Sequence, residues 1–266
     1  MLLTLVIPVF NETERIEKTF HGLKKGITFH GINGLEIIFV NDGSTDKTHR
    51  IISSWIKTKR AKNITYRLLS YKNNRGKGHA VKRGILASQG DYTLIMDADM
   101  STPLIELKKL LPFMEKGFDV VVGTRKNGHS TVVKHQPLYR EILGKGFTFL
   151  SNIILNTWIT DFTCGFKLFS KQAVKDIFPR SQVEHWGYDA ELLFLARKLG
   201  YPIKEVAVVW SNDERTKVNL LQALPQTLME LMTIRLNDIQ GKYRISSRSV
   251  IAKLRPALRW ITANVL

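Results

Sequence analysis

The chain has 266 residues, of which 44% are hydrophobic and 9% aromatic. This composition can bury a sizeable core, so it excludes a disordered chain and allows one large α/β domain with an appendage. Lysine and arginine total 40 against 23 aspartate and glutamate residues, and the formal net charge of +17 predicts attraction to an anionic partner. Nucleic acid, an acidic membrane face and phosphorylated substrates all match that charge.

Cys164 is the single cysteine of the chain, which excludes an intrachain disulfide and a multi-cysteine metal site and is compatible with a reducing compartment. The first residues lack a basic segment and reach Pro8 too soon for a signal peptide, so we interpret them as a first strand. No run of eighteen apolar residues occurs. The sequence therefore predicts peripheral rather than spanning membrane contact.

Units of strand, loop and helix recur along the first half of the chain. Short apolar runs predict buried strands at residues 3–9, 36–40, 65–69 and 92–96. Amphipathic helices are predicted after the first three strands, with Asn11 as the N-cap of the first helix and Gly90 beyond the end of the third. Buried strands alternating with such helices predict an α/β fold with a mostly parallel sheet and helices on both faces.

Two carboxylates end the fourth predicted strand. Asp97 and Asp99 follow its apolar run, and Pro103 stands where a first helical turn would begin. Ligands bind at the carboxyl ends of parallel strands, so we expect both side chains to face a crevice. One or two carboxylates plus phosphate oxygens are what Mg²⁺ prefers. A plain strand-to-turn transition is the alternative, because Asp is common in turns.

Other strand ends also carry polar side chains. Asp42 is placed to accept hydrogen bonds from a ribose or a base, or else it belongs to a plain turn in which Ser44 caps the next helix. The loop Arg75-Gly-Lys77-Gly is basic and backbone-permissive, as a loop beside phosphates should be, but it lacks the full P-loop spacing and fits a solvated turn as well. Arg125 would bring a guanidinium to the same edge, where it could neutralise phosphate charge.

A series of short motifs resembles the inverting glycosyltransferases of family 2, which have a GT-A fold. In chain order they are Val6-Ile-Pro-Val-Phe-Asn-Glu12, Val40-Asn-Asp-Gly-Ser44, Asn74-Arg-Gly-Lys-Gly78, Asp97-Ala-Asp99 and Val122-Gly-Thr-Arg125. The second half is similar to the dolichyl-phosphate β-glucosyltransferases, with the dolichol-phosphate mannose synthases as relatives. Its matching stretches are 161–169, 184–193, 208–210 and Lys217. The resemblance implies a GT-A (Rossmann-like) domain over residues 1–240, with a mixed, mostly parallel sheet and peripheral amphipathic helices.

The resemblance also implies where a nucleotide sugar, expected to be UDP-glucose, would bind. The nucleotide, metal and diphosphate contacts fall on Pro8, Phe10, Glu12, Val40, Asp42, Lys77, Asp97, Ala98 and Asp99. Asp97 and Asp99 would hold Mg²⁺ or Mn²⁺. The mannose synthases place a glutamine two residues after this pair, whereas this chain has Ser101, so a water is expected in that role. Arg215 and Lys217 fall on a loop that closes over the donor in the relatives.

On the acceptor side, the resemblance implies a polyprenyl or dolichyl phosphate. Arg125 and Arg140 would meet phosphate groups, although a serine near the second arginine in the mannose synthases is Gly144 here. Trp186 and Asp189 would line the sugar or acceptor pocket. Asp189 and Glu191 fit equally well as acids that complement the dipole at a helix start.

The chemistry follows from the substrates. A leaving nucleoside diphosphate needs its charge stabilised, which a cation on Asp97 and Asp99, assisted by an arginine, would do. A phosphate monoester has a second pKa near 6 and is already largely ionised at pH 7, so a lipid phosphate acceptor requires no general base. We expect inverting transfer of glucose to give a β-linked product. Transfer of mannose or N-acetylglucosamine to the same lipid class, or transfer to a glycan hydroxyl, is the alternative.

Two segments are candidates for membrane contact. Residues 138–159 predict an apolar helix with sparse charges, suited to a bilayer interface or to a buried core position. Residues 241–266 interleave basic and apolar residues, although Pro256 would kink a helix there. We therefore expect a peripheral protein on the cytoplasmic face of a membrane. Nucleic-acid binding is not expected, since the chain shows no zinc-ligand spacing or aromatic RNA-binding motif and its basic residues are dispersed.

Overall fold

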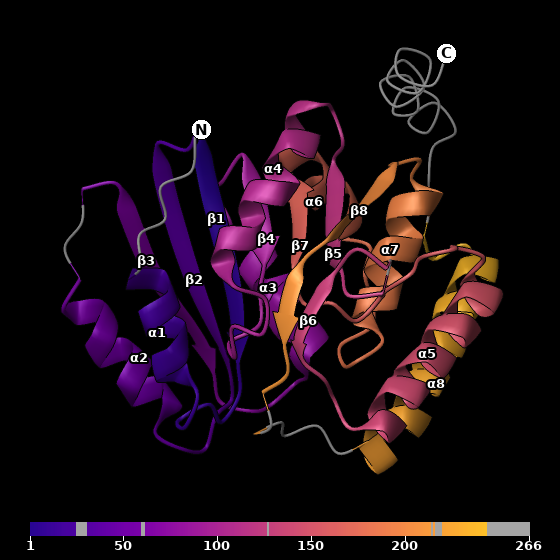
Figure 1. Ribbon diagram of the computed structural model, residues 1–266, viewed down its shortest axis with the longest axis horizontal. Coiled ribbons are helices and arrows are strands. Elements are labelled where there is room, and N and C mark those ends of the chain that lie inside the picture. Colours follow the sequence, from indigo (N-terminus) through magenta and orange to yellow (C-terminus); the bar gives the residue numbers. More distant parts are fainter. Residues whose placement is uncertain (25–30, 60–61, 127, 214, 216–219, 244–266) are drawn as a thin grey trace.

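In the computed structural model, the described residues (1–24, 31–59, 62–126, 128–213, 215 and 220–243) form a twisted seven-stranded sheet covered by helices on both faces, with a two-stranded sheet beside it (Figure 1). The strands are β1 (Leu2–Val9), β2 (Gly34–Asp42), β3 (Ile64–Tyr71), β4 (Tyr92–Ile95), β5 (Val120–Thr124), β6 (Thr131–Lys134), β7 (Lys167–Ser170), β8 (Ile203–Ala207) and β9 (Val209–Ser211). The helices are α1 (Ile16–Lys24), α2 (Thr48–Lys57), α3 (Lys77–Leu86), the 3-10 turn η1 (Leu104–Glu106), α4 (Leu107–Glu115), α5 (Leu138–Leu155), α6 (Lys171–Ile177), α7 (Tyr188–Lys198) and α8 (Leu220–Ile239).

The order of the strands places the site. The large sheet runs β3-β2-β1-β4-β7-β5-β8, and each neighbouring pair is parallel except those that involve β7. The strand order reverses between β1 and β4, which is the switch point where α/β sheets open a crevice at their carboxyl ends. The acidic pair follows β4 at that point. The smaller sheet pairs β6 with β9 beyond this edge.

The sheet separates two apolar cores, which explains why its central strands read as continuous apolar runs. One core lies under α1, α2 and α4 and includes Phe20, Ile52 and Leu107. The other lies under α3, α6 and α7 and includes Val81 and Ile177. Both faces of the sheet are therefore buried, and the mostly parallel α/β fold expected from the sequence is confirmed.

Several local expectations were wrong. Asn11 does not cap α1, which begins at Ile16; it adopts a left-handed backbone (φ 53°), and its Oδ1 accepts from the backbone N–H of Thr45 at 2.8 Å. Ser44 does not cap α2, because its hydroxyl accepts from the N–H of Asn11. The apolar helix predicted for 138–159 ends at Leu155, since the next residue has a left-handed backbone. Asn11 and Asn156 both adopt left-handed backbone conformations, which cannot be predicted from a pattern of apolar residues.

Helices α5 and α8 pack side by side at one end of the molecule (Figure 1). Both carry large exposed apolar side chains, among them Phe149 and Ile153 on α5 and Met229 and Met232 on α8. No helix in the described part of the chain has the length and hydropathy needed to cross a bilayer. Residues 244–266, most of the predicted basic tail, lie outside the described residues.

Candidate active site

A cleft of about 1000 Å³ opens at the carboxyl ends of β4 and β5. Its walls come from the acidic pair, the start of α3, the end of β5, helix α5, the turn before α7, and β9. Seven of the predicted site residues share this cleft: Lys77, Asp97, Asp99, Arg125, Arg140, Trp186 and Asp189. Segments far apart in sequence therefore meet at one concave surface.

Lys77 and Asp97 form the centre of the acidic end. Lys77, the first residue of α3, donates from Nζ to Asp97 Oδ1 at 2.6 Å and lies 5.9 Å from the ring centroids of both Trp186 and Tyr188. Burial alone would raise the pKa of Asp97, but the charge and hydrogen bond of Lys77, with Lys167 and Arg125 behind them, outweigh burial and lower it. Asp97 is therefore a carboxylate at neutral pH.

Gly165 allows Asp97 to take this position. A Cβ on Gly165 would lie 2.0 Å from Asp97 Oδ2, so any larger residue would push the carboxylate away. The glycine belongs to the 161–169 stretch, which the sequence analysis identified only by its resemblance to known enzymes. The close approach of Gly165 to Asp97 explains why a glycine is needed in that stretch.

Asp99 is accompanied by an arginine that sequence reasoning missed. Arg15 holds the carboxylate of Glu12 through Nε at 2.7 Å and Nη2 at 2.5 Å, and its Nη1 lies 3.7 Å from Asp99 Oδ2. Both carboxylate oxygens of Glu12, which was expected to contact the nucleotide, therefore accept hydrogen bonds from Arg15. The only signal in the sequence was a basic residue three positions after an acid, which ordinarily marks an exposed helix pair.

Asp42 supports the basic loop that precedes α3. Its carboxylate accepts hydrogen bonds from the Asn74 side chain at 2.9 Å and from the backbone N–H groups of Arg75 and Gly76 at 2.8 and 3.0 Å. Gly76 has a φ of 102°, a conformation that favours glycine. Asp42 therefore fixes the loop that delivers Lys77 to Asp97, and the plain turn with a serine cap does not describe it.

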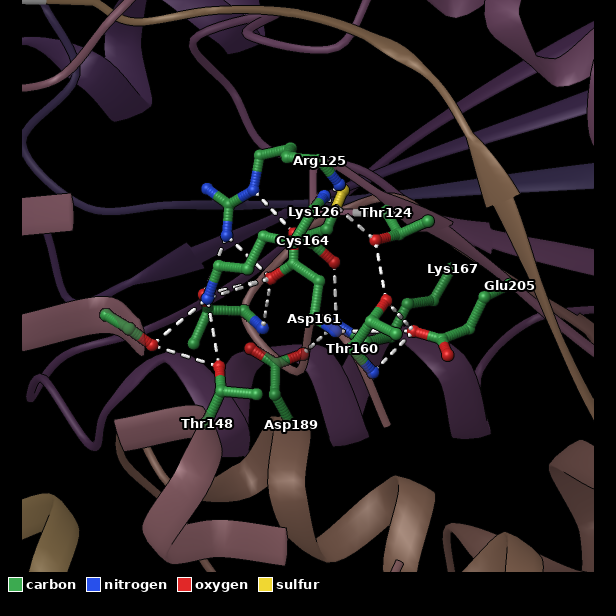
Figure 2. Close-up of polar contacts among 12 residues, drawn as sticks. Thr124, Arg125, Lys126, Thr148, Thr160, Asp161, Cys164, Lys167, Asp189 and Glu205 are labelled. Atoms are coloured by element: carbon green, nitrogen blue, oxygen red, sulfur yellow. Dashed lines mark hydrogen bonds and ion pairs between the residues drawn. The ribbon is translucent and has the colours of Figure 1, made fainter. Parts of the chain in front are cut away.

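Arg125 directly follows β5, and a buried carboxylate fixes its side chain. Its guanidinium contacts Asp161 through Nε at 2.7 Å and Nη2 at 2.8 Å (Figure 2). It also lies 5.1 Å from the centroid of the Trp210 ring on β9. Burial alone would raise the pKa of Asp161, but Arg125 lowers it well below its usual value. The fully buried Asp161 thereby fixes the orientation of an arginine that still lines the cleft.

Lys126, also missed by sequence reasoning, joins the end of β5 to α5. Its Nζ donates to the carbonyl of Gly144 at 3.0 Å and to Oγ1 of Thr148 at 2.9 Å (Figure 2). Its backbone N–H donates to Oγ1 of Thr124 at 3.1 Å. Burial lowers the pKa of Lys126; Asp161 opposes this effect, and the charges of Arg125 and Lys145 add to it.

Asp189 and Glu191 have different surroundings although both stand in the first turn of α7. Asp189 lines the cleft and accepts from Nζ of the fully buried Lys167 at 2.5 Å. Burial raises its pKa, and Lys167 and Lys77 oppose that rise. Glu191 is fully buried and accepts from the N–H of Val183 at 2.9 Å and from the hydroxyl of Tyr243 at 2.5 Å, so it does not line the cleft.

The remaining predicted residues that the structure describes do not line this cleft. Phe10 is 39% exposed, whereas Pro8 and Ala98 are buried. Val40 is buried against Gly84 of α3, so only its backbone could reach a nucleotide. Arg215 holds Asp213 through Nη2 at 2.7 Å and the carbonyl of Glu14 through Nη1 at 2.9 Å. Lys217 lies outside the described residues.

The acidic pair fits a hard divalent cation. Asp97 and Asp99 stand at the cleft, and the described residues contain no group of three or more His, Cys, Asp or Glu that could enclose a metal. Two carboxylates leave the other positions to water and phosphate oxygens, which suits Mg²⁺ or Mn²⁺ carried with a diphosphate.

Comparison with known proteins identifies sequence relatives over most of the chain. The sequence model of glycosyl transferase family 2 matches residues 4–178. The dolichyl-phosphate beta-glucosyltransferase of Dictyostelium discoideum is 35% identical, and the match covers 92% of this chain and 77% of that protein. Proteins of the same name from Saccharomyces cerevisiae and Homo sapiens are 33% and 30% identical and cover 92% and 91% of this chain and 77% and 78% of their own lengths.

Solved structures share the fold. Glucosyl-3-phosphoglycerate synthase from Mycobacterium tuberculosis, crystallised with Mn²⁺ and UDP-glucose, matches with a TM-score of 0.63 and 18% identity over 88% of this chain and 78% of that chain. S. aureus TarS 1-349 with UDP-GlcNAc matches with a TM-score of 0.59 and 17% identity over 99% of this chain and 74% of that chain. At these identities the likeness concerns the fold.

Proposed function

This chain belongs to glycosyl transferase family 2, and from that premise we propose that it transfers glucose from UDP-glucose to a polyprenyl phosphate of the dolichyl type, with inversion. One observation carries the proposal beyond the relatives' names. A single cleft joins an acidic end, at Asp97 and Asp99, to a basic end, at Arg125 and Arg140, beside the apolar helix α5. The acidic end suits a metal-bound nucleoside diphosphate, and the basic end suits a lipid-linked phosphate.

The transfer is an in-line displacement at the anomeric carbon. An oxygen of the acceptor phosphate forms a bond to C1 of glucose while the bond from C1 to the β-phosphate oxygen of UDP breaks, and UDP leaves with the electron pair. Inversion turns an α-linked donor into a β-linked product. Lys77 and Arg125 both line the cleft and carry positive charge, so they are placed to stabilise negative charge on the two phosphate groups.

Mg²⁺ or Mn²⁺ bound at Asp97 and Asp99 would neutralise the departing diphosphate. The protein's own part is to hold the two carboxylates ionised and aligned. Lys77 and the close approach of Gly165 fix Asp97, while Arg15 faces Asp99 and the N–H of Ser101 donates to Asp99 Oδ1 at 2.9 Å. Ser101 therefore supports Asp99 through its backbone, and a water remains the expected substitute for the glutamine of the mannose synthases.

The contacts of Asp189 support a mechanism without a protein base. A hydroxyl acceptor would need a carboxylate to take its proton, and Asp189 is the acid best placed for it, next to the cleft with a raised pKa. However, the buried ammonium of Lys167 holds one of its oxygens at 2.5 Å. An ionised phosphate acceptor has no proton that must be removed. This agrees with Asp189 binding Lys167 instead of a substrate hydroxyl.

We place the membrane contact on the paired helices α5 and α8. Their exposed apolar side chains include Phe149 at 65%, Ile153 at 58% and Met229 at 64%. An apolar face of this kind suits shallow insertion at a bilayer interface, and the net charge of +17 favours the anionic cytoplasmic leaflet. The contact is then peripheral and lies beside the basic end of the cleft.

A transfer assay with matched donors and acceptors tests the proposal. The full chain with Mg²⁺ is given radiolabelled UDP-glucose, UDP-N-acetylglucosamine or GDP-mannose, together with a polyprenyl phosphate or the corresponding polyprenol. We expect label in the lipid fraction with UDP-glucose and the phosphate acceptor. Transfer to the free alcohol, or to a soluble glycan in place of the lipid, would contradict the proposal.

A further inference from the structure

Lys126 occupies a position between the basic end of the cleft and the apolar helix. It follows Arg125 directly and lines the cleft, yet both recorded acceptors of its Nζ are neutral groups of α5, the Gly144 carbonyl and the Thr148 hydroxyl. Its side chain is 23% exposed. Lys126 is thus a part-buried cation that faces an open cleft, and the hydrogen-bond acceptors of its Nζ among the described residues are uncharged.

The local charges do not balance. Among the described residues, the closest recorded carboxylate oxygen to Lys126 Nζ is Asp161 Oδ1 at 4.0 Å, and that carboxylate is already in two-point contact with Arg125 (Figure 2). Figure 2 draws two further acids: Glu205 accepts from Thr160 Oγ1 at 2.6 Å and supports the turn that carries Asp161, and Asp189 accepts from Lys167 Nζ. Arg125 and Lys126 therefore share Asp161. Asp97 also acts on Arg125, but it is already paired with Lys77, so three cations face two carboxylates and one positive charge is in excess.

The cost of leaving Lys126 charged is visible in its pKa, which is lowered by burial and by its cationic neighbours. An anion bound in the cleft would raise the pKa of Lys126 again, because it would add a negative charge that the neighbouring protein groups do not provide. A phosphate is the anion that the cleft's chemistry calls for. It would accept a charge-assisted hydrogen bond from Lys126 and one from Arg125.

The surroundings distinguish between the two phosphates of the reaction. The acidic pair and Lys77 serve the donor diphosphate, whereas Lys126 is bonded to α5, whose Leu143 and Phe147 line the same cleft. Building on the proposed function, we propose that Lys126, together with Arg125, binds the phosphate group of the lipid acceptor, with the first isoprene units against α5. Gly144 leaves room here, since a Cβ on it would meet only Lys126 Nζ, at 3.9 Å.

The test separates the charge of Lys126 from its hydrogen bonds to α5. Lys126→Gln keeps a donor for the Gly144 carbonyl and removes the charge, Lys126→Arg keeps the charge, and Lys171→Gln removes an equal charge from an exposed site at the start of α6. Binding of farnesyl phosphate, farnesol and UDP with Mg²⁺ to the full chain is measured by calorimetry. We expect Lys126→Gln to weaken farnesyl phosphate binding by about tenfold to a hundredfold, the loss typical of one hydrogen bond to a charged group.

The same variant should bind UDP and farnesol as the wild type does, and Lys126→Arg should recover most of the loss. Unchanged farnesyl phosphate binding in Lys126→Gln, or an equal loss in Lys171→Gln, would overturn the assignment. So would an equal loss of UDP binding, or a lowered thermal midpoint without recovery in Lys126→Arg, because either indicates a donor-side or structural role. The proposed function is judged separately by the wild-type transfer assay, which can fail while this binding result stands.

Discussion

The contact between Gly165 and Asp97 offers the sharpest substitution at the acidic end. Gly165→Ala would place a Cβ 2.0 Å from Asp97 Oδ2, and the short aspartate side chain has to rotate away. We expect weaker Mn²⁺·UDP binding and a loss of transfer of about a hundredfold, the effect of moving a site group by roughly 1 Å. The free energy of unfolding should change by no more than about 1 kcal/mol, because the cleft can take up the movement.

Gly146→Ala is the matched control for this prediction. Gly146 lies within α5, and a Cβ there meets no atom within 4 Å. The alanine should stabilise the helix by about 1 kcal/mol through its better propensity, without changing Mn²⁺·UDP binding. Titration of Mn²⁺ by electron paramagnetic resonance reads binding directly, and normal affinity in Gly165→Ala would contradict the role given to the glycine.

Asp161 gives a pH-dependent prediction at the same scale. Its folded-state pKa is lowered, so the carboxylate contributes stability above the unfolded-state value near 3.9, and this contribution is lost as pH falls below about 4. Asp161→Asn leaves Arg125 part-buried without its partner and should cost about 3–5 kcal/mol at pH 7. Urea unfolding from pH 7 to pH 3 should show a smaller acid loss in this variant than in the wild type.

Glu115→Gln serves as the control, since it removes an exposed carboxylate at the end of α4 and should stay within about 0.5 kcal/mol of the wild type. An acid loss of equal size in Asp161→Asn and the wild type would show that other carboxylates account for it.

The residues that sequence reasoning found are those whose chemistry shows at the end of a strand. Asp97, Asp99 and Arg125 follow apolar runs, so their place at the cleft could be predicted. Arg15, Lys126 and Lys167 were missed because their roles depend on partners 84, 35 and 22 positions away: Asp99, Asp161 and Asp189. Asp42 and Glu12 were predicted to contact the nucleotide; in the structure the Asp42 carboxylate holds the loop before α3 and the Glu12 carboxylate holds Arg15.

At the scale of elements, α5 and α8 make a testable surface. Ile153→Glu with Met232→Glu places two charges on apolar side chains that are 58% and 54% exposed. Pelleting with anionic vesicles at low salt should fall strongly, since the apolar contribution is lost and repulsion from the leaflet is added. Ile105→Glu, at a 53% exposed position in η1, tests whether any exposed acidic substitution has this effect.

Wild-type protein should pellet and be only partly released by high salt, because burial of apolar side chains is not screened as charge is. Equal pelleting of the double variant and the wild type would show that the membrane contact lies elsewhere in the chain.

The sequence predicted α5 from its apolar pattern, but neither its partner α8 nor the end of α5 at Leu155 could be read from periodicity. Packing between distant helices and a left-handed turn decide those features.

At the scale of the whole molecule, the alternation of strands and helices was enough to predict the α/β class, and the family resemblance implied a mixed, mostly parallel sheet. That β7 is the antiparallel strand of the large sheet could not be read from the alternation. That strand matters for function. It carries Lys167 into the interior, where it meets Asp189, and the residues just before it bring Gly165 against Asp97. The fold thus brings the second half of the chain to the acidic pair, and the account of catalysis depends on that meeting.

The central claim is that the nucleophile is an ionised phosphate oxygen that needs no protein base. Single-turnover transfer from UDP-glucose to a polyprenyl phosphate is measured between pH 5 and 8 for the wild type, Asp189→Asn, and Lys167→Met/Asp189→Asn, which removes both charges of the buried pair. We expect the rate to fall as pH drops through the acceptor's second pKa near 6 in all three proteins, because this limb belongs to the substrate. Loss of a general base typically costs a factor of about 10² to 10⁴. A loss of about a thousandfold in both variants, together with disappearance of the acid limb while UDP-glucose still binds, would contradict the claim.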